Sequence, residues 1–258
     1  MASQRADTLE RTVLYAVELV DPVTGSPVTS GVRLEPLDAA GALLAGPPPT
    51  VNRSGRTVWL QPGHAWPAQI RLTPDKGLPF AARTEVVKPP AHDPTIVAGQ
   101  APPLAPADRL IRIVLAPTAS YPFEGVTAVR GLLLDTDNGT PQPDAVVQLA
   151  WQDAQSHQWR PAPPDLAAPR AATEAVTDAR GEFAAFLPPL PAGADPVVGD
   201  PHRVKVRLQV TRRVGGVAKT RWTPETAPPL SLPADGLVPD GQTFAGAVRL
   251  SWDRLSDH

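Results

Sequence analysis

The sequence predicts an all-β protein made of two tandem Greek-key β-sandwich domains, at residues 1–118 and 119–258. Three observations predict this class: alternating apolar and polar segments, an internal repeat, and a high content of proline and glycine. The 258 residues include 34 prolines and 19 glycines. Proline lacks a backbone N–H and clashes with the preceding helical turn, so prolines spread along a chain favour short strands joined by turns.

Strand-like alternation is clearest in Arg203–Val210, where charged or polar residues alternate with apolar ones. This period of two is typical of a half-buried strand, and it points the valines and the leucine inward. Similar segments occur at Val13–Val20, Arg109–Leu115 and Ala247–Trp252. The best helical candidate, Arg160–Val176, is interrupted by prolines. The pattern therefore favours strands throughout.

The second half of the chain repeats the motifs of the first half in the same order. Asp21–Pro27 contains Asp-x-x-x-Gly-Ser-Pro and recurs as Asp135–Pro141, with Gly-Thr-Pro at its end. Three further pairs follow, namely Gly31–Leu34 with Val146–Leu149, Asn52–Arg56 with Asp178–Glu182, and Ile70–Thr73 with Val206–Leu208. Matches in a preserved order predict one structural unit written twice.

The repeated motifs have the composition of turns. In the first motif, the aspartate is expected to bond its own backbone, the glycine to supply a positive φ, and the proline to restart an extended chain. Asn/Asp-x-x-Gly predicts a second hairpin. Ala116–Pro122 lies between the two copies and contains two prolines. It is predicted to be a short, semi-rigid linker.

The second copy resembles a known family. Val129–Asp135, Ala145–Leu149 and Ala175–Phe183, with the motif Thr-Asp-x-x-Gly-x-Phe, are similar to the carboxypeptidase regulatory-like domain. The resemblance implies a transthyretin-like (prealbumin-like) β-sandwich in which Phe183 points into the core, and a structural or binding module. Val51–Thr57 in the first copy lacks the aspartate and the phenylalanine, so its assignment depends on the repeat.

Composition and spacing argue against several kinds of catalysis. The absence of cysteine removes disulfides, thiolate nucleophiles and cysteine-ligated zinc. The five histidines are not paired at metal-ligand spacing. Asp135–Gly139 is similar to the start of a calcium loop, but its glycine is fifth and position twelve is Val146, so a turn is favoured. No nucleophile elbow, phosphate loop or dinucleotide motif is present. We expect no metal, no cofactor and no enzyme activity.

Charge argues against nucleic-acid partners and identifies one candidate surface. The formal net charge is −2, and no clustered basic run is available to neutralise phosphates. The most basic segment surrounds Gly215 and Gly216, a predicted hairpin tip. Its cations, the candidate contacts for an acidic protein partner, are Arg212, Arg213, Lys219 and Arg221. A solvated hairpin with no partner is the alternative.

The six tryptophans are numerous beside two tyrosines. Trp59 lies in an alternating segment and is predicted to be in the core. Trp159 flanks the insertion in the second copy, and Trp222 lies near a proline in turn-rich sequence. Both are candidate partner contacts, because exposed tryptophans anchor protein interfaces or stack on sugars. Burial against proline-rich loops is the alternative for both.

These features favour a structural or adaptor protein that binds other proteins in a multi-subunit assembly, with no small-molecule ligand. The resemblance suggests a phage tail-like or contractile injection particle as the setting. A carbohydrate-binding or adhesive module is the second hypothesis, with a glycan as ligand, and a hydrolase is the third. The first residues lack the apolar core and cleavage site of a signal peptide, and no segment has about 18 consecutive apolar residues. We therefore expect no membrane insertion, synthesis in the cytoplasm, and possible release as part of a particle.

Overall fold

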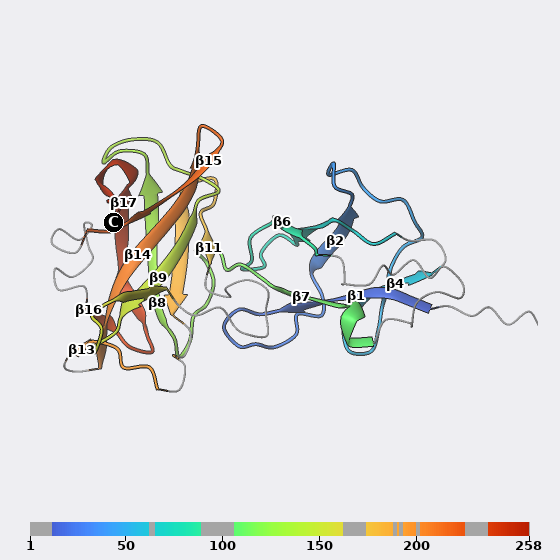
Figure 1. The fold of residues 1–258 in the computed structure, drawn as a ribbon, viewed down its shortest axis with the longest axis horizontal. Coiled ribbons are helices and arrows are strands. Elements are labelled where there is room, and N and C mark those ends of the chain that lie inside the picture. Colours follow the sequence, from blue (N-terminus) through green and yellow to red (C-terminus); the bar gives the residue numbers. More distant parts are fainter. Residues whose placement is uncertain are drawn as a thin grey trace, which may run out of the picture. The chain divides into compact units, whose positions relative to one another are not determined.

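A computed structural model describes residues 12–61, 65–88, 106–161, 174–187, 190, 193–199, 202–224 and 237–257. These residues divide into two compact units (Figure 1). The first comprises the described parts of Met1–Val20, Ser26–Asp75 and Ala82–Ile113. The second comprises those of Asp21–Gly25, Lys76–Ala81 and Val114–His258. The sequence prediction of two domains with a boundary at residue 118 stays a prediction.

The described regular elements are strands, apart from two short 3-10 helices, η1 (Pro106–Arg109) and η2 (Trp252–Arg254). The predicted all-β class is confirmed. The helical candidate Arg160–Val176 contains no helix where it is described, and residues 162–173 lie outside the described part of the chain.

The first unit contains two sheets. The first sheet has the strand order β3-β4-β1-β7, with bounds β1 (Thr12–Val20), β3 (Thr50–Val51), β4 (Thr57–Gln61) and β7 (Leu110–Val114). The second has the order β2-β5-β6, with bounds β2 (Val32–Leu37), β5 (Gln69–Pro74) and β6 (Arg83–Val86). Tyr15 stacks on Trp59 with ring centroids 4.7 Å apart. Trp59 is 1% exposed, which confirms its predicted core position.

The second unit also contains two sheets. The smaller has the order β12-β8-β17, with bounds β8 (Thr127–Leu134), β12 (Glu182–Leu187) and β17 (Thr243–Ser251). The larger is centred on β9 (Val146–Gln152) and β14 (Arg203–Val214). Five short strands pair with these two, namely β10 (Trp159–Pro161) and β11 (Ala175–Val176) with β9, and β13 (Val198–Gly199), β15 (Val217–Trp222) and β16 (Leu237–Pro239) with β14.

The core of the second unit is formed by apolar side chains from both sheets. The inward-facing residues predicted on β14 are buried in this core, namely Val204, Val206, Leu208 and Val210. Phe183 on β12 is fully buried in the same core. The inward position predicted for it is therefore confirmed.

The repeat found in the sequence recurs in the strand pairing. In each unit the opening strand, β1 or β8, lies between the closing strand, β7 or β17, and the strand that follows the Asn/Asp-x-x-Gly turn, β4 or β12. In each unit the other sheet contains a second run of three neighbours, β2-β5-β6 or β9-β14-β15. Each matched sequence motif lies at the equivalent place in this order.

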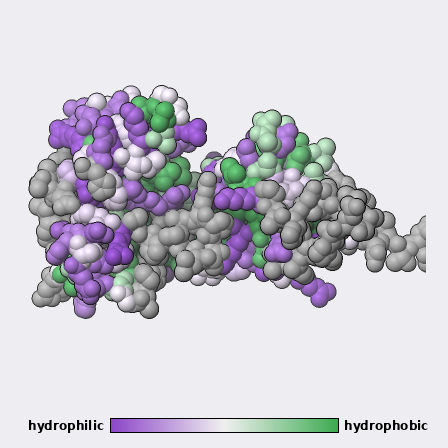
Figure 2. Space-filling view, in the orientation of Figure 1, coloured by the Kyte–Doolittle hydropathy of each residue, from purple (hydrophilic) through white to green (hydrophobic). Residues whose placement is uncertain are grey.

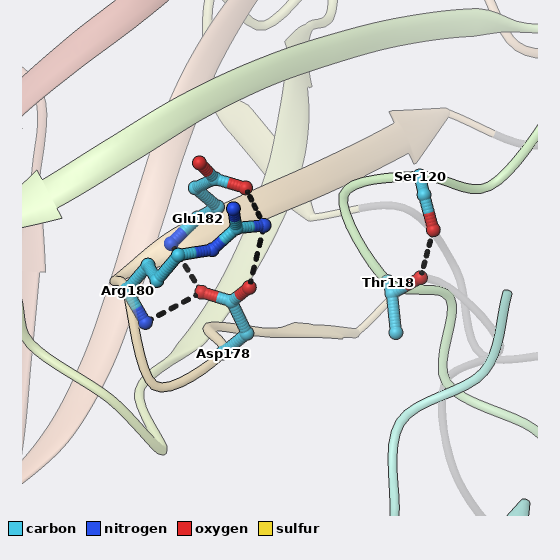
Figure 3. Close-up of polar contacts among 5 residues, drawn as sticks. All are labelled: Thr118, Ser120, Asp178, Arg180 and Glu182. Atoms are coloured by element: carbon cyan, nitrogen blue, oxygen red, sulfur yellow. Dashed lines mark hydrogen bonds and ion pairs between the residues drawn. The ribbon is translucent and has the colours of Figure 1, made fainter. Parts of the chain in front are cut away.

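The Asn/Asp-x-x-Gly turns have the same hydrogen bonds in both copies. The backbone N–H groups of Ser54 and Arg56 donate to Asn52 Oδ1, each at 3.0 Å. The N–H groups of Arg180 and Glu182 donate to Asp178 Oδ1 at 2.8 and 2.9 Å (Figure 3). In each turn the side-chain oxygen therefore satisfies two backbone donors.

The two Asp-x-x-x-Gly turns differ, which corrects one expectation. Gly25 has φ 67°, as predicted, and the N–H groups of Val23 and Thr24 donate to Asp21 Oδ1. Gly139 does not have a positive φ. A Cβ there would lie 1.6 Å from Asp135 Oδ1, so a larger residue would push the aspartate side chain out of its position in the turn. Close approach of the aspartate, rather than backbone handedness, explains this glycine.

The segment Ala116–Pro122, predicted as a linker, is packed into the second unit. Ala116 and Tyr121 are 1% and 5% exposed. The Ala81 N–H donates to the Ala116 carbonyl at 2.9 Å, and the Tyr121 hydroxyl donates to the Asp21 carboxylate at 2.7 Å. Within the segment, Thr118 and Ser120 share a hydroxyl–hydroxyl bond (Figure 3).

Candidate protein-binding surface

The basic segment predicted from the sequence is the hairpin of β14 and β15, drawn in orange in Figure 1. Gly215 and Gly216 form its two-residue tip with φ values of 61° and 82°. Both residues of such a tip need positive φ, which glycine adopts without strain. In the register of the two strands, Arg212 lies opposite Lys219, and Arg213 lies opposite Ala218.

Two of the four cations contact an aromatic side chain of the same unit. The guanidinium carbons of Arg212 and Arg221 lie 4.5 and 4.8 Å from the ring centroid of Trp252. Arg221 Nε also donates to Asp257 Oδ1 at 2.8 Å, and Arg212 donates to Gln142 Oε1. Burial lowers the pKa of Arg212 from its ordinary value. These two arginines therefore contact residues of their own unit through cation–π contacts and hydrogen bonds.

The other two cations are directed to solvent. Arg213 and Lys219 are exposed, and neither forms an ion pair with a described residue. On the face of this unit drawn in Figure 2, hydrophilic residues predominate among the described ones, with smaller hydrophobic patches among them. Arg213 and Lys219 are therefore the members of the predicted set that remain available to a partner.

Trp159 and Trp222 lie close to a third arginine, Arg207. The guanidinium carbon of Arg207 is 5.8 Å from the ring centroid of Trp159 and 5.3 Å from that of Trp222. Lys205 Nζ also lies 5.8 Å from the Trp159 centroid. Trp222 is 5% exposed, whereas Trp159 is half-buried. Of the two predicted contacts, only Trp159 offers appreciable surface.

Arg207 is a residue that the sequence pattern did not single out. Alternation along β14 places its side chain on the outer face of the sheet, yet it is 7% exposed. Its Nε donates to the Thr223 carbonyl and its Nη2 to Ser256 Oγ at 3.4 Å. The sequence carries no local signal for this burial, because Trp159 and Trp222 lie far from Arg207 along the chain.

The edge of β15 is covered at one position. The Trp222 N–H donates to the Ser256 carbonyl at 2.8 Å, and the Ser256 N–H donates to the Trp222 carbonyl at 2.9 Å. The segment after η2 therefore pairs with β15 at Trp222. The preceding residues of β15, Val217–Thr220, are exposed, and Val217 is 63% exposed.

The turn that is similar to a calcium loop is bonded within the protein. Asp137 accepts a hydrogen bond of 2.5 Å from Ser251 Oγ and pairs with Arg254. A hydrogen bond from the Thr136 N–H lowers the pKa of Asp135. The described residues contain no group of three or more His, Asp or Glu side chains placed to hold a metal ion. They also contain no helix with the length and apolar composition of a membrane span.

Comparison with known proteins gives no family assignment. No family model matches the chain, and no curated protein matches it. Solved structures with some similarity include a streptococcal ancillary pilin (11% identity, 84% of this chain, 60% of the pilin, TM-score 0.23). The major pilin subunit of Bacillus cereus is another (12% identity, 83% of this chain, 68% of the pilin, TM-score 0.22).

A third is the shaft pilin SpaA from Lactobacillus rhamnosus GG (10% identity, 81% of this chain, 93% of the pilin, TM-score 0.21). The chain spans only 60% of the length of the streptococcal ancillary pilin. TM-scores this low do not establish a shared fold.

Proposed function

We propose that this chain is a non-enzymatic structural or adaptor protein that binds other proteins within a multi-subunit assembly. The observation that carries the proposal is the duplicated β-unit, with a matching run of three strands in each of its sheets and the same turn hydrogen bonds in each copy. Such a chain holds two sets of loops and strand edges on rigid sheets, and binding residues are commonly presented in this way. The resemblance of the second copy to the carboxypeptidase regulatory-like domain supports the same role.

The surface that we assign to partner binding includes Arg213 and Lys219 at the β14–β15 hairpin. Both side chains are exposed, while the neighbouring arginines are held by Trp252. A rigid hairpin with free cations suits a partner with carboxylates, because charge complementarity selects the partner and accelerates the encounter.

The setting that we propose is a phage tail-like or contractile injection particle, with synthesis in the cytoplasm. This finer proposal rests only on the resemblance of the second copy to the carboxypeptidase regulatory-like domain, because similar domains occur in such particles. Identification of the proteins that co-purify with the chain would test the setting directly.

A carbohydrate-binding or adhesive module is the second candidate, and its sugar platforms would be Trp159 and Trp222. Stacking of a sugar requires an accessible ring face. Trp222 is 5% exposed, and Lys205 and Arg207 both lie near the ring of Trp159. These contacts favour protein binding over glycan binding.

The experiment is purification of the tagged full-length chain from its native host under mild conditions, followed by size-exclusion chromatography. We expect a stable complex of several different proteins. Cross-linking mass spectrometry should place at least one partner near Lys219, whose amine is exposed. A chain that purifies alone as a monomer, and that hydrolyses or modifies a small substrate, would contradict the proposal.

A further inference from the structure

Along β15, the backbone N–H and carbonyl groups point alternately toward β14 and away from it. Directly opposed residues of antiparallel strands alternate between pairs that exchange both hydrogen bonds and pairs that exchange none. Gln209 lies opposite Trp222, and the N–H and carbonyl of Trp222 bond to Ser256 instead. Trp222 therefore points its backbone groups away from β14.

The same alternation shows which way the backbone groups of Ala218 and Thr220 point. Thr220 and Ala218 are two and four residues from Trp222, so their N–H and carbonyl groups also point away from β14. Thr220 lies opposite Thr211, and their hydroxyls are 2.8 Å apart. This close side-chain contact is typical of a pair without backbone bonds. No described residue bonds to the outward groups of Ala218 or Thr220.

Both residues are accessible. Val217 through Thr220 are exposed, and pairing of Ser256 at Trp222 ends the covered part of the edge. An uncovered strand edge is a template for another strand. The four outward backbone groups of Ala218 and Thr220 could bond an extended segment in the way that Trp222 bonds Ser256.

Charge identifies the occupant. Arg213 and Ala218 are an opposed pair and share one face of the hairpin, whereas Lys219 lies on the other face. An added strand would thus meet a cation on each side. Antiparallel pairing of β15 with β15 of a second copy would bring the two basic hairpins together, and like charges in directly opposed positions are destabilising. An acidic segment would pair favourably with both cations.

We infer that the open edge of β15, at Ala218 and Thr220, is a docking site for an extended acidic segment of a partner protein, which adds to the sheet as a further strand. The inference rests on the proposed function, and it specifies the surface and the kind of partner. Backbone hydrogen bonds hold the segment, and Arg213 and Lys219 select its charge.

The test uses the full-length chain and two synthetic peptides of about six residues, a typical strand length. One peptide has two adjacent Glu residues at its centre, which point to opposite faces of a strand, with Val on either side, and the other has Lys in place of each Glu. We expect the acidic peptide to bind at least about tenfold more tightly by calorimetry. Its binding should slow hydrogen exchange at the Ala218 and Thr220 amides. Equal affinity for the two peptides, or no binding of either, would overturn the inference.

Three variants separate edge pairing from general attraction. Thr220→Pro removes an N–H that β14 does not use, and proline is tolerated on a strand edge facing solvent. It should weaken acidic-peptide binding by at least about tenfold with an unchanged circular dichroism spectrum. Lys219→Glu tests the charge without altering the backbone and should weaken binding similarly. Arg249→Glu is the control, because Arg249 is an exposed arginine on β17 and its loss should leave binding unchanged.

Loss of binding in the Arg249→Glu variant, or full binding by Thr220→Pro, would exclude the β15 edge. If the Thr220→Pro variant still forms the complete assembly in the host, docking at the β15 edge is contradicted, whereas the proposed adaptor function is supported. If the acidic peptide binds at Ala218 and Thr220 but the chain purifies alone from its host, docking at the β15 edge is supported and the proposed adaptor function is contradicted.

Discussion

Gly131 and Phe183 are directly opposed on β8 and β12, and each explains the identity of the other. A Cβ on Gly131 would lie 2.6 Å from Phe183 Cζ and 2.4 Å from the Val248 carbonyl oxygen. Glycine therefore leaves the space that the phenylalanine ring occupies between the two sheets. Residue 131 cannot gain a side chain unless both the ring and the β17 backbone move.

Replacement of Phe183 by alanine should destabilise the second unit by about 3–5 kcal/mol, because it removes a fully buried ring and leaves a cavity. Urea denaturation of the full-length chain measures the effect. Val198→Ala is the control: Val198 is 69% exposed, and its truncation should change stability by less than about 0.5 kcal/mol. An unchanged denaturation curve for Phe183→Ala would show that the assigned register of β12 is wrong.

The turn aspartates Asp135 and Asp153 should titrate below their ordinary pKa of 3.8. The main cause at Asp135 is the hydrogen bond from the Thr136 N–H, and at Asp153 it is the bond from the Ser156 N–H. A lowered pKa in the folded state stabilises the fold above the unfolded pKa, and this contribution is lost as the pH falls through the folded pKa. Carbon-detected NMR of the carboxyl groups measures both values, and titration at or above 3.8 would contradict the turn geometry.

At the scale of single elements, the turn at Asp178 can be compared with the equivalent turn of the first unit, where asparagine takes the place of the aspartate. Asn52 makes the same two side-chain bonds to backbone N–H groups that Asp178 makes. Asp178→Asn should therefore retain the hairpin. Asp178→Ala should cost about 1–3 kcal/mol, because two N–H donors lose their acceptor. Thermal melts of the two variants would contradict this account if alanine and asparagine were equivalent.

Most strands could be predicted from the sequence because their alternation is local. The repeat also predicted which turns are equivalent. The parallel pairing of β17 with β8 could not be predicted, because register between distant strands depends on packing across the whole core. The contacts of Arg212 and Arg221 with Trp252 were missed for the same reason: Trp252 lies far along the chain, beyond β17.

At the scale of the whole molecule, the second unit includes segments from the first half of the sequence. Tyr121 bonds to Asp21, and its ring lies 5.9 Å from that of Phe80. A fragment of residues 119–258 lacks both partners, although it matches the boundary predicted from the sequence. The fragment should melt at a lower temperature than the same unit in the full-length chain.

Differential scanning calorimetry of the fragment and the full-length chain measures this difference. Tyr121→Phe in the full-length chain is the control that removes only the bond to Asp21. Its melting temperature should lie between those of the other two proteins. Equal melting temperatures for fragment and full-length chain would show that Asp21–Gly25 and Lys76–Ala81 contribute nothing to the second unit.

The parallel pairing of β8 with β17 has a mechanical consequence. The two strands run side by side in the same direction, from Thr127 to Leu134 and from Thr243 to Ser251. A pulling force applied at Thr127 and Ser251 would slide one strand along the other, so it would load the hydrogen bonds of the ladder together rather than one after another. Single-molecule pulling along this axis should therefore meet high resistance.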